Sequence, residues 1–391
     1  MPDQPDEPSP EKAKRQAERA ARQAANRAER AAVQATRRAE REAARNASNP
    51  AVEPSSPPPP DGVSQRFNIL IVAQAGRLEY QAVLFAASLR QNATDFSGRL
   101  IVAEPANDGA WTGHQTRISD PVRSALTELG AKVTPFVAEH FGASYPYGNK
   151  IEALALLPQD EPFLFVDTDT LVTGPLDRVA FDFDKPAASM RREATWPDPP
   201  LYGPGYTDIW RSLYDRFGLE FKSSLDLSQP DEHWERYLYF NAGWFFGSDP
   251  AEFAARFLAW SVEVRDAPGE ALAAQSLDPW LDQVVLPLVI HSLAGGRPGP
   301  QLPPLDNGAA LWHYRNLSLL YAEAPESVVA ALERAVADPR AAILADWSQV
   351  QQMVLDGQGR AKVRPLFDRA RLPSRQQAIR QKLKSEGLWL T

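Results

Sequence analysis

The chain has 391 residues, of which 43% are hydrophobic, so it can bury one large core or two average ones. It contains no cysteine, which excludes disulfides and thiolate chemistry. The formal net charge of −8 makes general nucleic-acid binding a poor prediction, and no apolar run has the length of a membrane span.

The N-terminal part of the chain differs in composition from the rest. Residues 1–10 are acidic and Pro-rich and predict a disordered leader, without the apolar segment of a secretory signal. Residues 11–46 hold Ala, Arg, Glu and Gln, which predict a long solvated helix stabilised by Glu/Arg pairs. A weak coiled coil or a contact with a protein or an anionic membrane surface is the alternative. Residues 47–65 contain four consecutive prolines and predict a stiff linker. We therefore expect a cytoplasmic or membrane-peripheral protein.

From residue 66 the pattern becomes that of an α/β domain. Apolar strands and amphipathic helices alternate with short connections: strands at 67–73, 99–103, 132–137 and from 163, with helices at 80–90, 121–129 and 149–157. This rhythm predicts a doubly wound, mostly parallel sheet flanked by helices. Further along we expect strands at 187–190, 237–246 and 309–314, and helices at 206–217, 252–265 and 279–293. The domain is expected to span residues 66–324, and residues 325–391 to form a helical extension with a basic tail.

The segment Phe163–Val172 is the strongest functional signal. Four apolar residues predict a strand buried on both faces, and Asp167 and Asp169 follow where that strand should end. Residues two apart in a strand point to the same side, so both carboxylates are expected to meet at the carboxyl edge of the sheet, where α/β sheets bind ligands. Two adjacent anions need a cation or a shared proton, and a divalent cation that bridges to a substrate phosphate is the natural partner. Helix capping or water binding is the structural alternative.

At this point the chain resembles GT-A-fold glycosyltransferases, and is most similar to the retaining family that includes glycogenin and bacterial galactosyltransferases. The resemblance spans residues 67–316 and rests on motifs that follow one another in the family's order. They are Gly76-Arg77-Leu78-Glu79-Tyr80, Asn149-Lys150-Ile151-Glu152-Ala153-Leu154, Val166-Asp167-Thr168-Asp169, Phe240-Asn241-Ala242-Gly243-Trp244-Phe245-Phe246, Leu281-Asp282-Gln283 and Trp312-His313-Tyr314.

The resemblance implies a metal-dependent transfer of a sugar from a nucleoside-diphosphate sugar to an unknown hydroxyl acceptor. A set of carboxylates and an imidazole suits Mn²⁺ or Mg²⁺. Asp167, Asp169 and His313 would hold that metal, and Asp167 could instead reach the donor ribose. Gln74, Ala75, Gly76 and Tyr80 would form the base site, with Tyr80 stacked on the base. The catalytic candidates beside the transferred sugar would be Asn241, Asp282 and Gln283.

The donor phosphates are where the chain departs from the family pattern. Lys150 would reach them as a point charge. The family usually follows its histidine with Gly and Lys, whereas this chain has Tyr314 and Arg315 after His313. Arg315 could act as the phosphate clamp instead.

Each site residue also has a structural interpretation. Tyr80 could pack on the sheet, Lys150 could be an exposed helix residue, Asn241 could lie in a bulged strand and Asp282 could stabilise a helix start. Two other functions compete. Asp167 and Asp169 also fit the first motif of haloacid-dehalogenase-type phosphatases, although three predicted strands precede them. A non-catalytic scaffold that binds nucleotide sugars is the other alternative.

Overall fold

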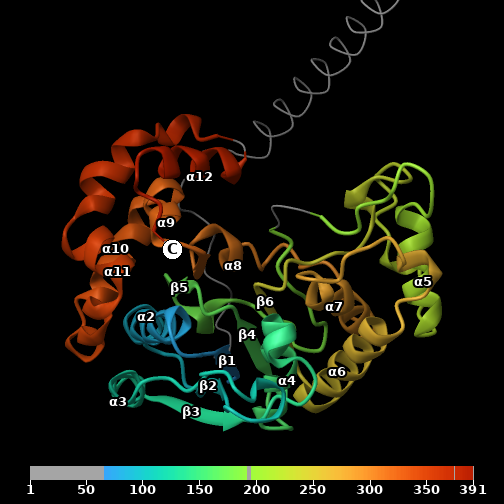
Figure 1. The fold of residues 1–391 in the computed structure, drawn as a ribbon, viewed down its shortest axis with the longest axis horizontal. Helices are drawn as coiled ribbons and strands as arrows, with labels where there is room; N and C mark the ends of the chain where they lie inside the picture. Colours follow the sequence, from blue (N-terminus) through green and yellow to red (C-terminus); the bar gives the residue numbers. More distant parts are fainter. Residues whose placement is uncertain (1–65, 192–194, 374, 391) are drawn as a thin grey trace, which may run out of the picture. The chain divides into compact units, whose positions relative to one another are not determined.

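The computed structural model describes residues 66–191, 195–373 and 375–390. The predicted leader, Ala/Arg-rich helix and linker of residues 1–65 lie outside the described residues. The described residues belong to one unit, residues 61–391. Figure 1 shows its helices arranged around a central sheet.

The central sheet has five strands in the order β3-β2-β1-β4-β6. The four parallel strands are β1 (Asn68–Val72), β2 (Leu100–Pro105), β3 (Ala131–Phe136) and β4 (Phe163–Val166). The fifth, β6 (Trp244–Gly247), is antiparallel to β4. The prediction of a mixed, mostly parallel sheet is thus confirmed. β1, β2 and β4 are buried along their whole length, as expected for strands covered on both faces.

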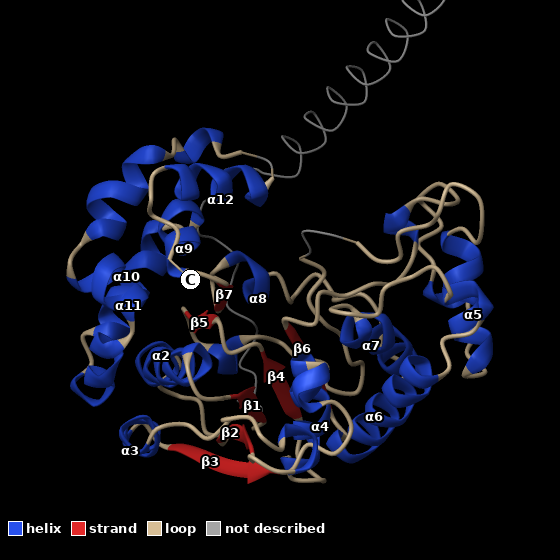
Figure 2. Ribbon diagram, in the orientation of Figure 1, coloured by secondary structure: helices blue, strands red, loops and turns tan. Residues whose placement is uncertain are grey.

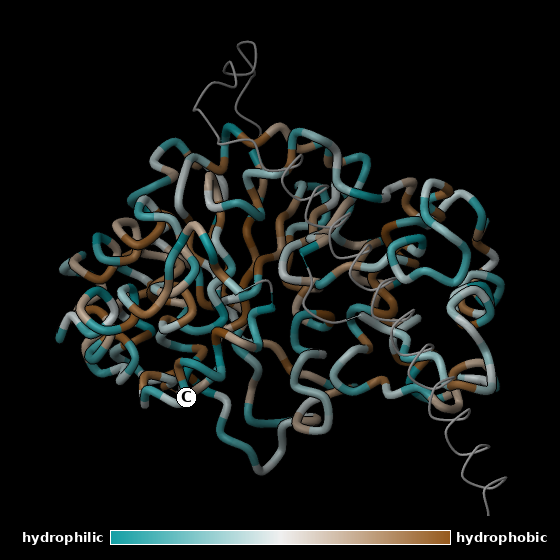
Figure 3. Tube along the Cα trace, turned by 90° about the horizontal axis from the view of Figure 1, so that it is seen from above, coloured by the Kyte–Doolittle hydropathy of each residue, from teal (hydrophilic) through white to brown (hydrophobic). Residues whose placement is uncertain are grey.

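The period of two along the strands divides the apolar core into two halves. Ile69 and Ile71 of β1 face one half, and Leu70 and Val72 face the other. The first half is covered by α2 (Arg77–Asn92), α3 (Asp120–Glu128), α9 (Leu317–Glu323), α10 (Glu326–Val336) and α12 (Gln376–Ser385). The second is covered by α4 (Asn149–Glu152), α5 (Tyr206–Arg216), α6 (Pro250–Asp266) and α7 (Leu281–Ser292). Figure 2 shows these helices around the strands, and Figure 3 shows hydrophobic segments running through the middle of the unit.

A small second sheet was not predicted. β5 (Thr170–Val172) pairs antiparallel with β7 (Leu311–His313), with Thr170 opposite His313. β7 lies within the strand predicted at 309–314, but β5 follows β4 too closely for the apolar pattern to separate the two. The short helices α8 (Pro304–Asn307) and α11 (Ser348–Val350) complete the set.

Two predicted strands are shorter than expected. The segment predicted as a strand at 237–246 is buried, but it is extended into the sheet only from Trp244. Ala242 has a positive φ of 57°, and the Asn241 side chain accepts a hydrogen bond from the Gly243 amide at 2.8 Å. This local bond turns the backbone away from strand geometry. The strand predicted at 187–190 is reduced to one bridge, Ala188 to Phe245.

The last described residues are tied to the start of α9. The Asn316 amide donates to the Leu390 carbonyl at 2.6 Å, and the Ser318 hydroxyl donates to the Leu388 carbonyl at 2.7 Å. These bonds place the end of the chain beside the carboxyl edge of the sheet. Among the described residues, no helix combines the length and the apolar character that crossing a membrane requires.

Candidate active site

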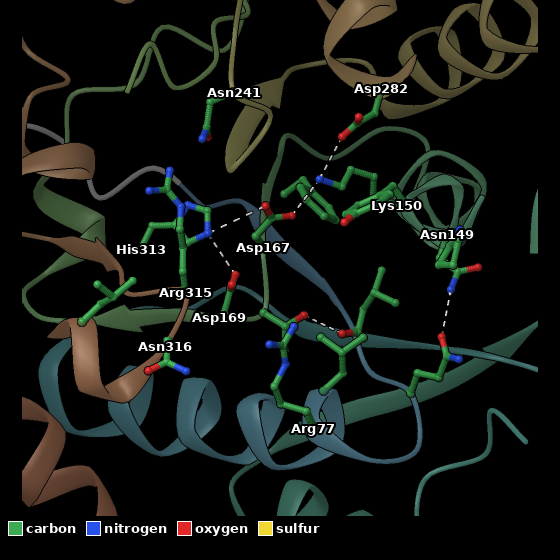
Figure 4. A pocket seen from close by; sticks show the side chains of 18 of the residues that line it. Arg77, Asn149, Lys150, Asp167, Asp169, Asn241, Asp282, His313, Arg315 and Asn316 are labelled. Atoms are coloured by element: carbon green, nitrogen blue, oxygen red, sulfur yellow. Dashed lines mark hydrogen bonds and ion pairs between the residues drawn. The ribbon is translucent and has the colours of Figure 1, made fainter. Parts of the chain in front are cut away.

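A cavity of about 720 Å³ lies at the carboxyl ends of β1 and β4. Its walls come from distant segments: the start of α2, α4, the link from β4 to β5, the start of α7, the link from β7 to α9, and the end of the chain. Its acidic, basic and histidine lining residues are Arg77, Lys150, Asp167, Asp169, Asp282, His313, Arg315 and Arg380, most of which Figure 4 labels.

Asp167, Asp169 and His313 form one cluster in this cavity. The Nε2 atom of His313 lies 3.0 Å from an Asp169 oxygen and 4.0 Å from an Asp167 oxygen. One ligand atom from each residue can be chosen so that all three lie within 4.8 Å of one another. The carboxylates do converge, but not through strand alternation, because residues 167–169 form a bend between β4 and β5. The pairing of Thr170 with His313 then brings the imidazole to the carboxylates.

The cluster is suited to a divalent cation. Burial acts to raise the pKa of Asp169, but the ion pair with His313 lowers it to about 2, so this carboxylate is charged at neutral pH. Burial raises the pKa of Asp167, and the neighbouring Lys150 opposes that rise. Two carboxylates and one imidazole at this spacing match the ligands that Mn²⁺ takes and that Mg²⁺ accepts.

Lys150 occupies a buried ion-pair network rather than the helix surface. Its side chain is only 9% exposed, and its Nζ atom lies 2.8 Å from an Asp167 oxygen and 3.1 Å from an Asp282 oxygen. It also donates to the Ala242 carbonyl at 3.3 Å. An ammonium group has three protons, and these three acceptors use all of them. The expected contact between Lys150 and the donor phosphates would therefore require one of these bonds to break.

Asp282 is buried at the first turn of α7 and is held from two sides. Beyond Lys150, the Tyr145 hydroxyl lies 2.8 Å from an Asp282 oxygen and accepts from the Asp282 amide at 3.0 Å. Burial raises the pKa of Tyr145 well above its usual value, so Tyr145 remains a neutral donor. The network joins Asp282 to the metal-site candidate Asp167 through one lysine.

The other two catalytic candidates also line the cavity. Gln283 accepts a hydrogen bond from the Tyr239 hydroxyl at 2.7 Å, so its amide nitrogen is the end left to interact with a substrate. Asn241 uses its oxygen for the Gly243 amide. Figure 4 shows Asn241 and Asp282 reaching the cavity from the side opposite Arg77.

The predicted base site is only partly assembled. Gln74 lines the cavity and accepts from the Asn149 amide at 3.2 Å, while Asn149 in turn accepts from the Trp111 indole at 2.9 Å. Ala75 and Gly76 do not line the cavity. The Ala75 amide donates to the Thr116 carbonyl, and the Gly76 amide donates to the Glu79 side chain at the start of α2.

Tyr80 is also placed away from the cavity. Its ring stacks on Trp347 with centroids 6.4 Å apart and an interplanar angle of 14°. Tyr80 packs against the apolar core, and the expected stacking of its ring on a base stays a prediction.

Several cavity residues were missed from the sequence, among them Tyr147, Arg380 and Trp389. Tyr147 is 50% exposed and lines the cavity from a short turn before α4; the aromatic and proline-rich stretch Tyr145-Pro146-Tyr147 was the available signal. Arg380 and Trp389 line it from the C-terminal tail, which the sequence presented only as a basic helix. Nothing in the local pattern places that tail at the site.

The phosphatase alternative is not supported by this arrangement. Three strands of the sheet precede β4, and Asp167, which would have to be the nucleophile, is paired with a buried lysine and an imidazole.

Comparison with known proteins identifies the family of this chain. Residues 69–294 match the family model described as Rhodobacterales glycosyltransferase domain. Structural similarity is found to the galactosyltransferase LgtC in complex with donor and acceptor sugar analogues, with 17% identity, a TM-score of 0.33, and coverage of 56% of this chain and 69% of that one. The glycosyltransferase GlyE of Streptococcus pneumoniae TIGR4 has 12% identity and a TM-score of 0.38, with coverage of 74% and 65%. The bifunctional glycosyltransferase WbbM has 14% identity and a TM-score of 0.33, with coverage of 61% and 39%. No curated protein matches. These structural similarities are low, so the family model carries the assignment.

Proposed function

We propose a sugar donor and a donor-binding site for this chain. The chain belongs to the family of Rhodobacterales glycosyltransferase domains and is therefore a sugar-transfer enzyme. The donor is a nucleoside-diphosphate sugar, and its diphosphate binds beside Asp167, Asp169 and His313. The observation that carries this proposal is the convergence of two carboxylates and an imidazole, from segments more than a hundred residues apart, in one cavity.

Asp167, Asp169 and His313 would hold Mn²⁺ or Mg²⁺. When bound, the metal supplies Lewis-acid neutralisation of the diphosphate leaving group. His313 would bind the metal through Nε2, the imidazole atom that faces both carboxylates.

The opposite wall of the cavity supplies the residues for the sugar. The buried Lys150 orients Asp282, and its burial prevents its side chain from moving with a bound ligand. The amide nitrogen of Gln283 and the side chain of Asn241 would bind sugar hydroxyls. Retention of anomeric configuration is part of this proposal and rests on the resemblance of the motifs alone. The acceptor is a hydroxyl compound that enters from the open side of the cavity.

The test is Asp169→Asn in the full chain, with Asp182→Asn as the matched control. Asp182 belongs to a second Asp-x-Asp pattern, and it is exposed and paired only with Lys185. Thermal unfolding with a panel of nucleoside-diphosphate sugars, with and without Mn²⁺, identifies the donor, because a ligand of the native state raises the melting temperature. Hydrolysis of that donor is then measured.

We expect Asp169→Asn to lose metal-dependent binding and donor hydrolysis while it remains folded, and Asp182→Asn to keep both. A wild-type chain that binds no donor would refute the proposal. Binding of a donor without any turnover would favour the scaffold alternative.

A further inference from the structure

Positive charge gathers on one side of the cavity. Arg77, Arg315 and Arg380 line it from the start of α2, the link from β7 to α9 and the middle of α12. Figure 4 shows Arg77 and Arg315 on the same side of the cavity as Asp169. Of these segments, only α2 lies within residues 69–294, so the family match does not account for the other two cations.

Arg315 and Arg380 are held close to each other by one side chain. Both guanidinium groups donate to the Oε1 atom of Gln376, Arg315 at 3.5 Å and Arg380 at 2.6 Å. Gln376 donates through its nitrogen to Glu323 at 3.2 Å, which keeps its oxygen turned toward the two cations. Two positive charges on the cavity wall attract an anion that enters the cavity.

The backbone supports the same interpretation. Arg315 has a φ of 57°, a left-handed conformation that a non-glycine residue rarely adopts and that costs free energy. The Arg315 amide points to the Asp169 carbonyl at 3.4 Å, which ties this arginine directly to the carboxylate cluster. On α12, Arg380 lies with its guanidinium carbon 5.8 Å from the centre of the Trp389 ring.

We propose that Arg315 and Arg380 form an anion subsite for the diphosphate of the donor, with α12 supplying the second arginine. This inference rests on the proposed function and extends it to the C-terminal segment. Planar guanidinium groups bind phosphate oxygens in pairs, which an ammonium group cannot do. The two arginines would take the place of the Gly and Lys residues that this chain lacks after His313. In that case α12 is part of the donor site and not only a solvent-exposed helix.

The test compares Arg380→Met with Lys384→Met in the full chain. Lys384 lies one turn further along α12 and contacts the same Trp389 ring at 5.7 Å, but it does not line the cavity. Affinities for UDP, GDP and ADP, and for the corresponding nucleosides, are measured by titration calorimetry with Mn²⁺. Thermal unfolding of each variant reports whether it is folded.

We expect Arg380→Met to weaken binding of the nucleoside diphosphate by about ten- to a hundredfold, the usual effect of one charged hydrogen-bonding group, and to leave nucleoside binding unchanged. Arg380→Lys, which keeps the charge without the planar fork, should recover part of the loss, and Lys384→Met should bind as the wild type does. Unchanged diphosphate affinity in a folded Arg380→Met protein would overturn this inference and leave the proposed function standing. An equal loss for nucleoside and diphosphate would also overturn it. A wild-type chain that binds no nucleoside diphosphate would overturn both.

Discussion

Removal of Lys150 is the sharpest test of the buried network. In Lys150→Met the ammonium is lost, and the Asp282 carboxylate, which is 1% exposed, keeps the Tyr145 hydroxyl as its hydrogen-bond donor. Asp167 loses its 2.8 Å partner at the same time. Breaking a buried ion pair by removing one partner typically costs about 3–5 kcal/mol, because the remaining charge is buried and uncompensated. We expect a loss of unfolding free energy in that range.

The measurement is urea unfolding followed by tryptophan fluorescence, arranged as a double-mutant cycle with Asp282→Asn. Asp282→Asn alone should destabilise, but in the Lys150→Met background it should restore stability because it removes the stranded charge. Lys185→Met is the control, since Lys185 pairs with Asp182 on the exposed surface and should change stability by no more than about 0.5 kcal/mol. The reasoning would be refuted if Asp282→Asn had the same effect in both backgrounds.

Three further predictions concern the site and the core. A Cβ atom at Gly243 would lie 2.7 Å from His313 Nδ1, so Gly243→Ala should weaken Mn²⁺ binding, measured by calorimetry, more than it lowers the melting temperature; unchanged affinity would contradict the packing. Tyr239→Phe should lower kcat and leave donor affinity near the wild-type value, because Gln283 loses the hydrogen bond that orients it. In steady-state kinetics, an unchanged kcat would show that Gln283 does not contact the sugar. Burial raises the pKa of Tyr214 to about 12, so the folded state keeps this proton while the unfolded state loses it at pH 10. The contribution of Tyr214 to the unfolding free energy should therefore fall by about 1.4 kcal/mol per unit between pH 10 and 12, and Tyr214→Phe should remove that part of the loss in unfolding measured against pH.

The main sheet could be predicted from the sequence because its signal is local. The strands at 68–72, 100–105, 131–136 and 163–166 are short apolar runs separated by helical periodicity, and each was expected within about two residues. The failures occurred where one side chain redirects the backbone. The bond from the Gly243 amide to the Asn241 side chain lies inside the strand predicted at 237–246, so the strand begins only at Trp244; propensity alone does not report such a bond.

The site could be predicted where motifs identify residues, but not where distant segments meet. Asp167, Asp169 and His313 were named from their sequence context and lie together. Tyr80 was expected at a base, yet its ring lies against Trp347, a residue far along the chain. Arg380 reaches the cavity because α12 folds back along α9, and a single sequence contains no signal for that contact.

The pairing of β5 with β7 fixes the spacing of the three residues in the candidate metal site. Thr170 opposite His313 sets how far the imidazole stands from the carboxylates, whatever the intervening chain does. A slip of one residue would turn His313 to the other face and remove it from the cluster. The segment around α5, which lies between the two strands in the chain, can therefore change in length over evolution while the ligand spacing stays constant.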